Sequence, residues 1–320
     1  MNVIVAIDSL KGSLSSLQAG AAAKAGILRA IPDTTVSVKP VADGGEGTVT
    51  ALVSGLSGRS VTIAVTGPLG ETVEATYGIL PDHTAVIEMA EAAGLPLVPA
   101  EKRNPMNTTT YGVGEMILHA LDEGCRNFII GIGGSATNDG GTSMLRALGC
   151  RFRKVDGTDI APGAQELSEL ATIETEALDP RLEESHFSIA CDVTNPLCGT
   201  NGASYIFAPQ KGADPATVQK LDAALAHLAD MTAVTLGTDL REHPGAGAAG
   251  LGFAFASYLN GTLRPGVDIV LDAVLPRSEL RAADIVVTGE GRFDGQTAMG
   301  KAPVGIARRA KACGCKVIVL

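Results

Sequence analysis

Glycine-rich stretches containing polar residues follow several short apolar runs of this chain. They are DSLKGSLSS from Asp8, DGGEGT from Asp43, GIGGSATNDGG from Gly131, CDVTNPLCGTNGA from Cys191 and GEGRFDGQTAMGKAP from Gly289. Open α/β sheets bind ligands at the carboxyl ends of their strands, so such stretches are candidate ligand sites. Glycine also lets the backbone approach a bound group closely. The sequence therefore predicts a site built at strand ends.

Cationic and backbone groups in two of these stretches could bind an anion. Lys11 precedes a helix that we expect to begin near Ser15, and the free N–H groups of a helix start attract anions. The alternative there is a capped turn with a solvated lysine. Residues 133–141 combine glycines with short polar side chains, and their N–H groups could form an anion-binding nest. That loop lacks G-x-S-x-G, which argues against a serine hydrolase.

Carboxylates accompany two further stretches. Asp192 follows the run FSIAC and could accept a proton from a substrate hydroxyl, as an aspartate does in phosphoryl transfer. The alternative is that it caps a turn, which Asn195 and the proline after it would fix. Asp43 and Glu46 flank glycines, where they could hold a cation or a hydroxyl, or close a tight turn.

The last stretch contains G-x-x-x-x-G-K, from Gly295 to Lys301, which imitates a phosphate-binding P-loop. A P-loop follows its strand directly and ends in Lys-Ser or Lys-Thr, whereas here six residues intervene and Ala-Pro follows the lysine. We therefore interpret the pattern as an echo of that motif. Lys301 and the helix expected from Pro303 could still hold phosphate, and Glu290 and Asp294 could hold Mg²⁺.

Other patterns argue against zinc and dinucleotide sites. GAGAAG, at 245–250, matches G-x-G-x-x-G, but REHP precedes it where a strand should be, so we expect a close-packed helix start. The five histidines lack zinc-ligand spacing. The six cysteines form no C-x-x-C pair and suit buried thiols.

The two ends of the chain share a strand–helix–strand pattern. Residues 2–41 contain NVIVAI, a helix opened by a capping box at Ser15 and Gln18, and TTVSVKPV. The other end contains DIVVTG, a helix and KVIVL, and because the sequence stops in that strand we expect a longer natural protein. We predict one Rossmann-like parallel-sheet domain from residues 1–62 plus 285–320.

The middle of the chain has a different pattern. SVTIAVTG, ETVEATYGIL and TAVIEMA are separated by short turns, as antiparallel strands are, and helices alternate with buried strands after them. Residues 63–284 are therefore expected to form a central mixed-sheet α/β domain. The fold class is α/β with two domains.

Charge and hydropathy limit the function classes. The formal net charge of −10 opposes nucleic-acid binding, which needs clustered Lys and Arg. No stretch reaches the length of a membrane span and MNVIVAID lacks a signal peptide's basic region, so we expect a cytoplasmic protein. A small-molecule ligand is favoured, and the chain could form a homo-oligomer.

Six motifs, in the same order along nearly the whole chain, resemble those of the bacterial type 1 glycerate kinase family. They are DSLKGSLSS, DGGEGT, GGSATNDGG, DVTNPLCGTNGA, GAGAAGLGFAF and TGEGRFDGQTAMGKAPVGIA. Leu251 departs slightly, since a small residue often stands there in the family. The resemblance implies a two-domain α/β kinase with its active site in the cleft between domains. It also implies transfer from Mg-ATP to D-glycerate, giving 2-phospho-D-glycerate and ADP.

The expected roles join this resemblance to the residues above. Asp192 is the expected base, Lys11 and Lys301 are expected to contact phosphate or carboxylate, and Glu290 and Asp294 are the expected Mg²⁺ ligands. The expected substrate and nucleotide contacts are Ser9, Ser13, Asp43, Gly44, Gly45, Glu46, Gly133, Gly134, Ser135, Thr137, Asn138, Asp139, Asn195, Gly289 and Gln296.

Four alternatives stay open. The acceptor could be another small hydroxy acid, or the product could be 3-phosphoglycerate. An NAD-dependent dehydrogenase would need GAGAAG to bind the cofactor. A non-catalytic binding protein is disfavoured because candidate acid, base and phosphate-binding groups occur together.

Overall fold

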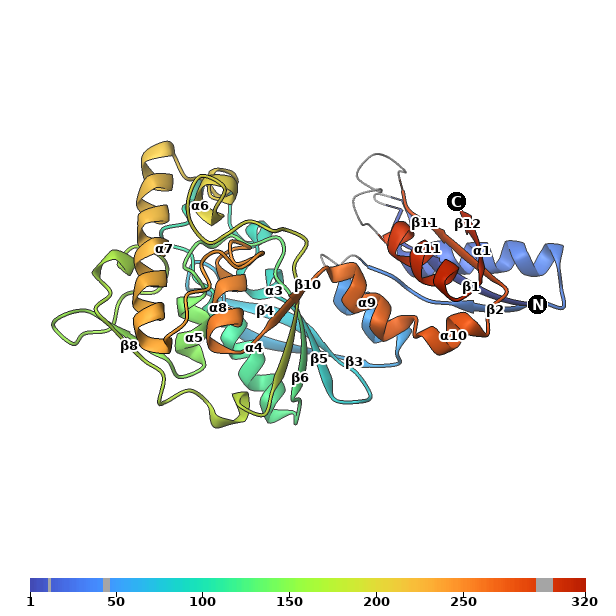
Figure 1. The fold of residues 1–320 in the computed structure, drawn as a ribbon, viewed down its shortest axis with the longest axis horizontal. Helices are drawn as coiled ribbons and strands as arrows, with labels where there is room; N and C mark the ends of the chain where they lie inside the picture. The colour runs from blue at the N-terminus through green and yellow to red at the C-terminus, as the bar shows by residue number, and fades with distance from the viewer. Residues whose placement is uncertain (11–12, 43–46, 292–301) are drawn as a thin grey trace. The chain divides into compact units, whose positions relative to one another are not determined.

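The chain folds into two compact α/β units (Figure 1). The computed structural model describes residues 1–10, 13–42, 47–291 and 302–320. The first unit, here called the split-chain unit, comprises Met1–Arg59 and Pro265–Leu320. The second, here called the central unit, comprises Ser60–Arg264.

A parallel four-stranded sheet forms the split-chain unit. Its strand order is β12 (Lys316–Val319), β11 (Ile285–Gly289), β1 (Asn2–Ile7) and β2 (Thr35–Val38). Helix α1 (Ser16–Ala30) connects β1 to β2, and α11 (Ala302–Ala312) precedes β12. The expected capping box is confirmed, since Ser15 Oγ accepts from the backbone N–H of Gln18 and Gln18 Oε1 accepts from that of Ser15.

The strand order reverses between β1 and β11. From β1 the chain passes through α1 to β2 on one side, whereas from β11 it continues through α11 to β12 on the other. Such a switch point opens a crevice at the carboxyl ends of the two strands.

The segment 265–284 packs with the chain ends, although the sequence analysis assigned it to the central domain. It contains α9 (Gly266–Val274) and α10 (Arg277–Arg281), and α9 contacts both α2 (Thr48–Gly55) and α11. The physical reason is the apolar surface of α9, where Val270 and Leu271 are fully buried.

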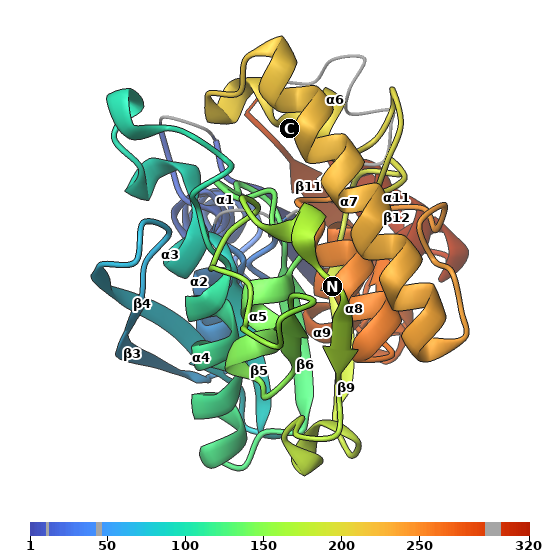
Figure 2. The same ribbon diagram turned by 90° about the vertical axis from the view of Figure 1, so that its left-hand side faces the viewer.

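A mixed six-stranded sheet organises the central unit. Its order is β10 (Thr262–Arg264), β9 (His186–Ala190), β6 (Asn127–Gly131), β5 (Thr84–Glu88), β4 (Thr72–Ile79) and β3 (Arg59–Thr66). The strands β10, β9, β6 and β5 pair in parallel, and β4 pairs antiparallel with β5 as expected. Figure 2 shows β5, β6 and β9 side by side.

Helices and short elements surround this sheet. The longer helices are α4 (Tyr111–Asp122), α5 (Thr142–Ala147), α7 (Pro215–Leu236) and α8 (Leu251–Tyr258). The short elements are α3 (Ala90–Ala93), η1 (Leu95–Leu97), η2 (Ala100–Lys102), β7 (Arg151–Arg153), η3 (Leu167–Glu169), β8 (Thr172–Glu174), η4 (Pro180–Leu182), α6 (Ala203–Phe207) and η5 (Pro209–Lys211). Strands β7 and β8 pair antiparallel as a separate ribbon. Within the described ranges, no helix is both long and apolar enough to cross a bilayer.

The GAGAAG segment begins α8 and packs against the predicted anion loop. Gly250 is the N-cap of α8 at φ +72°, and a Cβ atom there would lie 2.6 Å from the Cα of Gly140. Only glycine fits both this left-handed backbone and this close approach. The expected close-packed helix start is confirmed.

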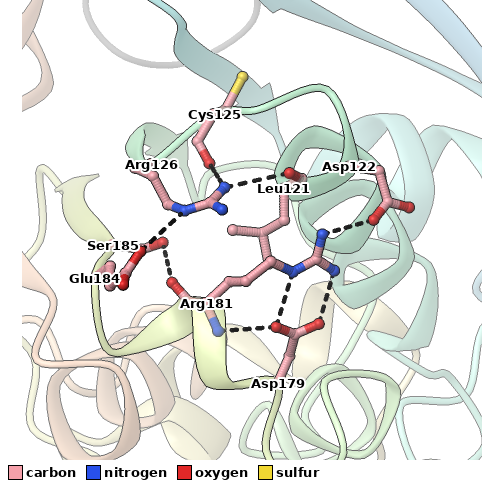
Figure 3. Close-up of polar contacts among 8 residues, drawn as sticks. All are labelled: Leu121, Asp122, Cys125, Arg126, Asp179, Arg181, Glu184 and Ser185. Carbon is pink, nitrogen blue, oxygen red and sulfur yellow. Dashed lines mark hydrogen bonds and ion pairs between the residues drawn. The ribbon is translucent and has the colours of Figure 1, made fainter.

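An arginine network lies at the amino ends of β6 and β9 (Figure 3). Arg181 forms two side-chain hydrogen bonds with Asp179, of 2.9 and 2.7 Å, and a third with Asp122 of 2.7 Å. Arg126 Nη1 donates to the carbonyls of Leu121 and Cys125. This network therefore links α4, η4 and the two strand starts at the edge opposite the candidate ligand loops.

Candidate functional site

Three parallel strands of the central unit end in register at one edge of the sheet. Glu88 pairs with Gly131, and Gly131 pairs with Ala190. The loop that follows β6 and the segment that follows β9 therefore leave the same edge. The structure thus places the predicted contacts of the 133–141 loop at the sheet edge from which the Asp192 segment departs.

Residues 133–135, here called the rim, form the outer part of the loop after β6, and Ser135 is the buried member of the three. Gly133 and Gly134 are exposed, and Gly134 has φ +73°. A bridge between Gly94 and Ser135 pins the rim, with 2.8 Å between Leu95 N and Gly134 O. Within the described part of the chain, the backbone N–H groups of the rim donate no hydrogen bond. Successive N–H groups of this kind are suited to bind an anion.

Asp139 anchors the inner part of the loop. Its carboxylate is fully buried and accepts hydrogen bonds from Thr110 N at 3.0 Å, Thr110 Oγ1 at 2.8 Å and Gly141 N at 3.1 Å. Thr110 is the N-cap residue of α4, and its Oγ1 also accepts from Met144 N in α5. The carboxylate predicted to contact substrate is thus engaged in tying the loop to two helices.

Thr137 and Asn138 are buried in the same loop. The amide nitrogen of Asn138 donates to Ser204 Oγ at 3.0 Å. Thr137 Oγ1 and Asn138 Oδ1 have no hydrogen-bond partner among the described residues. A buried polar atom without a partner costs about 1–3 kcal/mol, so these two atoms lower the free energy of unfolding.

Lys211 lies beneath this loop and was missed by the sequence analysis. It ends η5, is 2 % exposed, and its Nζ donates to Ser135 Oγ at 2.8 Å and to Thr137 O at 2.6 Å. Burial lowers the pKa of Lys211 to about 7, and the field of Asp139 opposes this shift. The only sequence signal was a lysine between a helix-like segment and a Gly-containing turn, a common surface pattern.

The segment after β9 holds the predicted base. Asp192 is exposed, two residues beyond the end of the strand, whereas its neighbour Cys191 is buried. Burial raises the pKa of Cys191, which makes this thiol a poor nucleophile. Asn195 Nδ2 donates to Asn201 O at 2.8 Å, and Asn195 O accepts from Gly247 N at 2.9 Å. Asn195 therefore closes the turn that follows Asp192.

A cavity in the split-chain unit occupies the switch point between β1 and β11. Its volume is about 520 Å³, and its lining includes Ile7 at the end of β1 and three predicted residues, Ser13, Gly289 and Glu290. The predicted contact Ser9 lies at the same strand end, where its N–H donates to Asp8 Oδ1 at 2.7 Å. The structure thus brings part of the predicted set to the crevice that an α/β sheet uses for ligands.

Eight predicted site residues lie outside the described residues. They are Lys11, Asp43, Gly44, Gly45, Glu46, Asp294, Gln296 and Lys301. The interpretation of G-x-x-x-x-G-K as an echo of a P-loop concerns the same undescribed segment. Among the residues that the structure does describe, no group of three or more His, Cys, Asp or Glu side chains could hold a metal ion.

The two units define an α/β protein whose candidate ligand groups lie at the carboxyl ends of parallel strands. The sequence profile of the Glycerate kinase family matches residues 3–320. The chain belongs to the glycerate kinase family, and its enzyme class is that of a kinase.

Curated relatives and a solved structure agree with this assignment. A glycerate kinase of Bacillus subtilis (strain 168) is 51% identical over 320 residues, which span 99% of this chain and 84% of that protein. The glycerate 2-kinase of Escherichia coli (strain K12) is 48% identical over 97% of this chain and 82% of that protein. A crystal structure from Salmonella typhimurium LT2, provisionally assigned as a glycerate kinase 2, superposes with a TM-score of 0.96 at 48% identity. That match covers 100% of this chain and 86% of the other.

Proposed function

We propose that this chain transfers the γ-phosphoryl group of ATP to the 2-hydroxyl of D-glycerate and releases 2-phospho-D-glycerate and ADP. The observation that carries the proposal is the 133–135 rim, in which Gly133 and Gly134 are exposed and whose backbone N–H groups donate no hydrogen bond to any described residue. Both substrates carry anionic oxygens, as a carboxylate or as phosphates. The name of the Escherichia coli relative, a glycerate 2-kinase, supports the choice of the 2-hydroxyl.

Asp192 is proposed as the general base. It accepts the proton of the 2-hydroxyl as that oxygen attacks the γ-phosphorus and the bond from phosphorus to the ADP oxygen breaks. Its exposure beyond β9 leaves it accessible to a substrate, which the buried Asp139 is not. The turn closed by Asn195 holds the segment in place.

The switch-point cavity is proposed to take part of the nucleotide. Ser13 and the backbone of Gly289 supply polar groups there, and Glu290 supplies a carboxylate, the kind of oxygen ligand that Mg²⁺ prefers. Bound Mg²⁺ would neutralise charge on the phosphate oxygens. Lys11, Lys301 and Asp294 keep their proposed roles as phosphate contacts and metal ligand.

The test is turnover with defined substrates. ADP release is measured with Mg-ATP and D-glycerate, with L-glycerate and an acceptor-free reaction as controls, and the product is followed by phosphorus NMR. Phosphate on the 2-oxygen couples to one proton, whereas phosphate on the 3-oxygen couples to two. A doublet is expected. A triplet would overturn the choice of hydroxyl, and turnover only with another hydroxy acid would overturn the choice of substrate.

A further inference from the structure

Lys211 is buried and forms no direct ion pair with a carboxylate of the described residues, which is unusual because burying an ammonium group is costly unless it is paired. The partners of Lys211 in the described structure are the Ser135 hydroxyl and the Thr137 carbonyl, both neutral. Asp139 acts on it only through its field and is already held by Thr110 and Gly141. Because burial of this ammonium group is unfavourable, we look for its role in the loop that it contacts.

The contact with Lys211 orients the hydroxyl of Ser135. Because Ser135 Oγ accepts a hydrogen bond from Lys211 Nζ, its own hydrogen is directed elsewhere and is available for donation. Ser135 is 8 % exposed and directly follows the exposed Gly133 and Gly134. Its hydroxyl therefore adds a side-chain donor to the backbone N–H groups of the rim.

We propose that Lys211 is a positioning residue that fixes Ser135 and the carbonyl of Thr137, so that the 133–135 rim binds an anionic group of one substrate. This inference rests on the proposed function. The anion is the carboxylate of D-glycerate or a phosphate of the nucleotide, since both present oxygens to the same donors. Lys211 does not touch the substrate in this scheme. Its ammonium charge increases the affinity of the rim for the anion.

The charge of Lys211 makes anion binding depend on pH. With a pKa lowered by burial to about 7, the ammonium form decreases as pH rises through neutrality. Anion binding is therefore strongest below pH 7 and weakens above it. The one charged group whose field acts on Lys211 in the described structure is Asp139, a buried acceptor of hydrogen bonds.

The experiment compares Lys211→Met with Lys220→Met, which alters an exposed lysine at the start of α7. For K211M we expect KM for one substrate to rise roughly tenfold, the loss of about one charge-assisted hydrogen bond, while kcat changes much less. K220M should match the wild type. A rise in KM for D-glycerate identifies the carboxylate as the anion, and a rise in KM for ATP identifies a phosphate.

The pH profile and a second variant separate positioning from a structural role. The affected KM of the wild type should rise between pH 6 and pH 8.5, and that of K211M should stay flat. Ser135→Ala should raise the same KM, and the double variant should lose little more than either single one. If K211M fails to fold, the KM of S135A and the pH dependence of the wild-type KM test the proposal instead.

Three outcomes would overturn the role of Lys211. They are an unchanged KM for both substrates in folded K211M, additive effects of K211M and S135A on KM, and a wild-type KM that does not change with pH. A wild type without turnover on D-glycerate would instead count against the proposed function.

Discussion

Two aspartates of strand-end loops, Asp192 as the expected base and Asp139 as an expected substrate or nucleotide contact, have different environments in the structure. Asp139 is fully buried with three hydrogen-bond donors around its carboxylate, whereas Asp192 is exposed beyond β9. Residue type and spacing indicate that both carboxylates belong to strand-end loops. They do not indicate which one faces inward, because that depends on Thr110, a residue distant in the sequence.

Substituting these two aspartates by asparagine should therefore affect different properties, kcat for Asp192 and the free energy of unfolding for Asp139. Asp192→Asn should lower kcat by about 10²–10⁴-fold, the usual contribution of a general base. Asp139→Asn should reduce the free energy of unfolding by about 1–3 kcal/mol, because an amide cannot accept from all three donors. Steady-state kinetics and urea denaturation of both variants give the comparison. An unaltered kcat in D192N removes Asp192 as the base.

Lys211 shows where residue-level prediction ends. Residues 133–135 were a candidate site from sequence, because glycines and short polar residues after an apolar strand indicate a ligand loop, and that role stays a prediction. The lysine was not, because its burial results from packing between η5 and a loop about 75 residues earlier in the chain. Local sequence carries almost no information about such a contact.

At the scale of elements, local chemistry predicts starts and ends well. The capping box of α1 and the start of α8 were foreseen from side-chain and glycine patterns. The placement of α9 was not, because its apolar face suits any core of sufficient size. Its partners, α2 and α11, come from opposite ends of the chain. Packing partners of this kind cannot be deduced from periodicity.

The junction between α8 and the loop predicts a difference between two glycines with the same backbone angle. Gly250 and Gly237 both have φ +72°, but a Cβ at Gly237 would meet nothing within 4 Å. Gly237→Ala should cost about 1 kcal/mol of unfolding free energy for the left-handed backbone. Gly250→Ala should cost about 1–3 kcal/mol more, since the loop backbone at Gly140 must move.

Urea denaturation measures both glycine variants. Because Gly140 belongs to the loop that carries the 133–135 rim, G250A should also raise KM for the substrate bound there, and G237A should not. Equal losses of stability in the two variants would contradict the proposed close packing.

At the scale of the whole molecule, the two edges of the central sheet serve different purposes. The carboxyl edge carries polar loops with unsatisfied groups at Thr137 and Asn138. The amino edge carries the Arg181 network, in which each described polar side chain of Figure 3 has partners. We therefore expect the Arg181 network to contribute to stability, and the loop at the carboxyl edge to contribute to the proposed anion site.

Arg181→Met should therefore reduce stability without altering catalysis. Arg181 makes bidentate contact with Asp179 and a further contact with Asp122, and it is only partly exposed. We expect a loss of about 1–2 kcal/mol in the free energy of unfolding and unchanged kcat and KM. Arg151→Met, at an exposed arginine of β7, is the matched control and should stay within about 0.5 kcal/mol of wild type.

The pH dependence of this loss tests its cause. The hydrogen bonds from Arg181 hold the pKa of Asp179 below its usual range. A carboxylate with a lowered pKa in the folded state contributes stability above its unfolded pKa, near 3.9, and loses it as pH falls through the folded pKa. The difference in unfolding free energy between wild type and R181M should thus be constant from pH 7 to about pH 5 and shrink below about pH 4. A difference that persisted undiminished at pH 3 would assign the contribution of Arg181 to the packing of its aliphatic stem instead of to its ion pair.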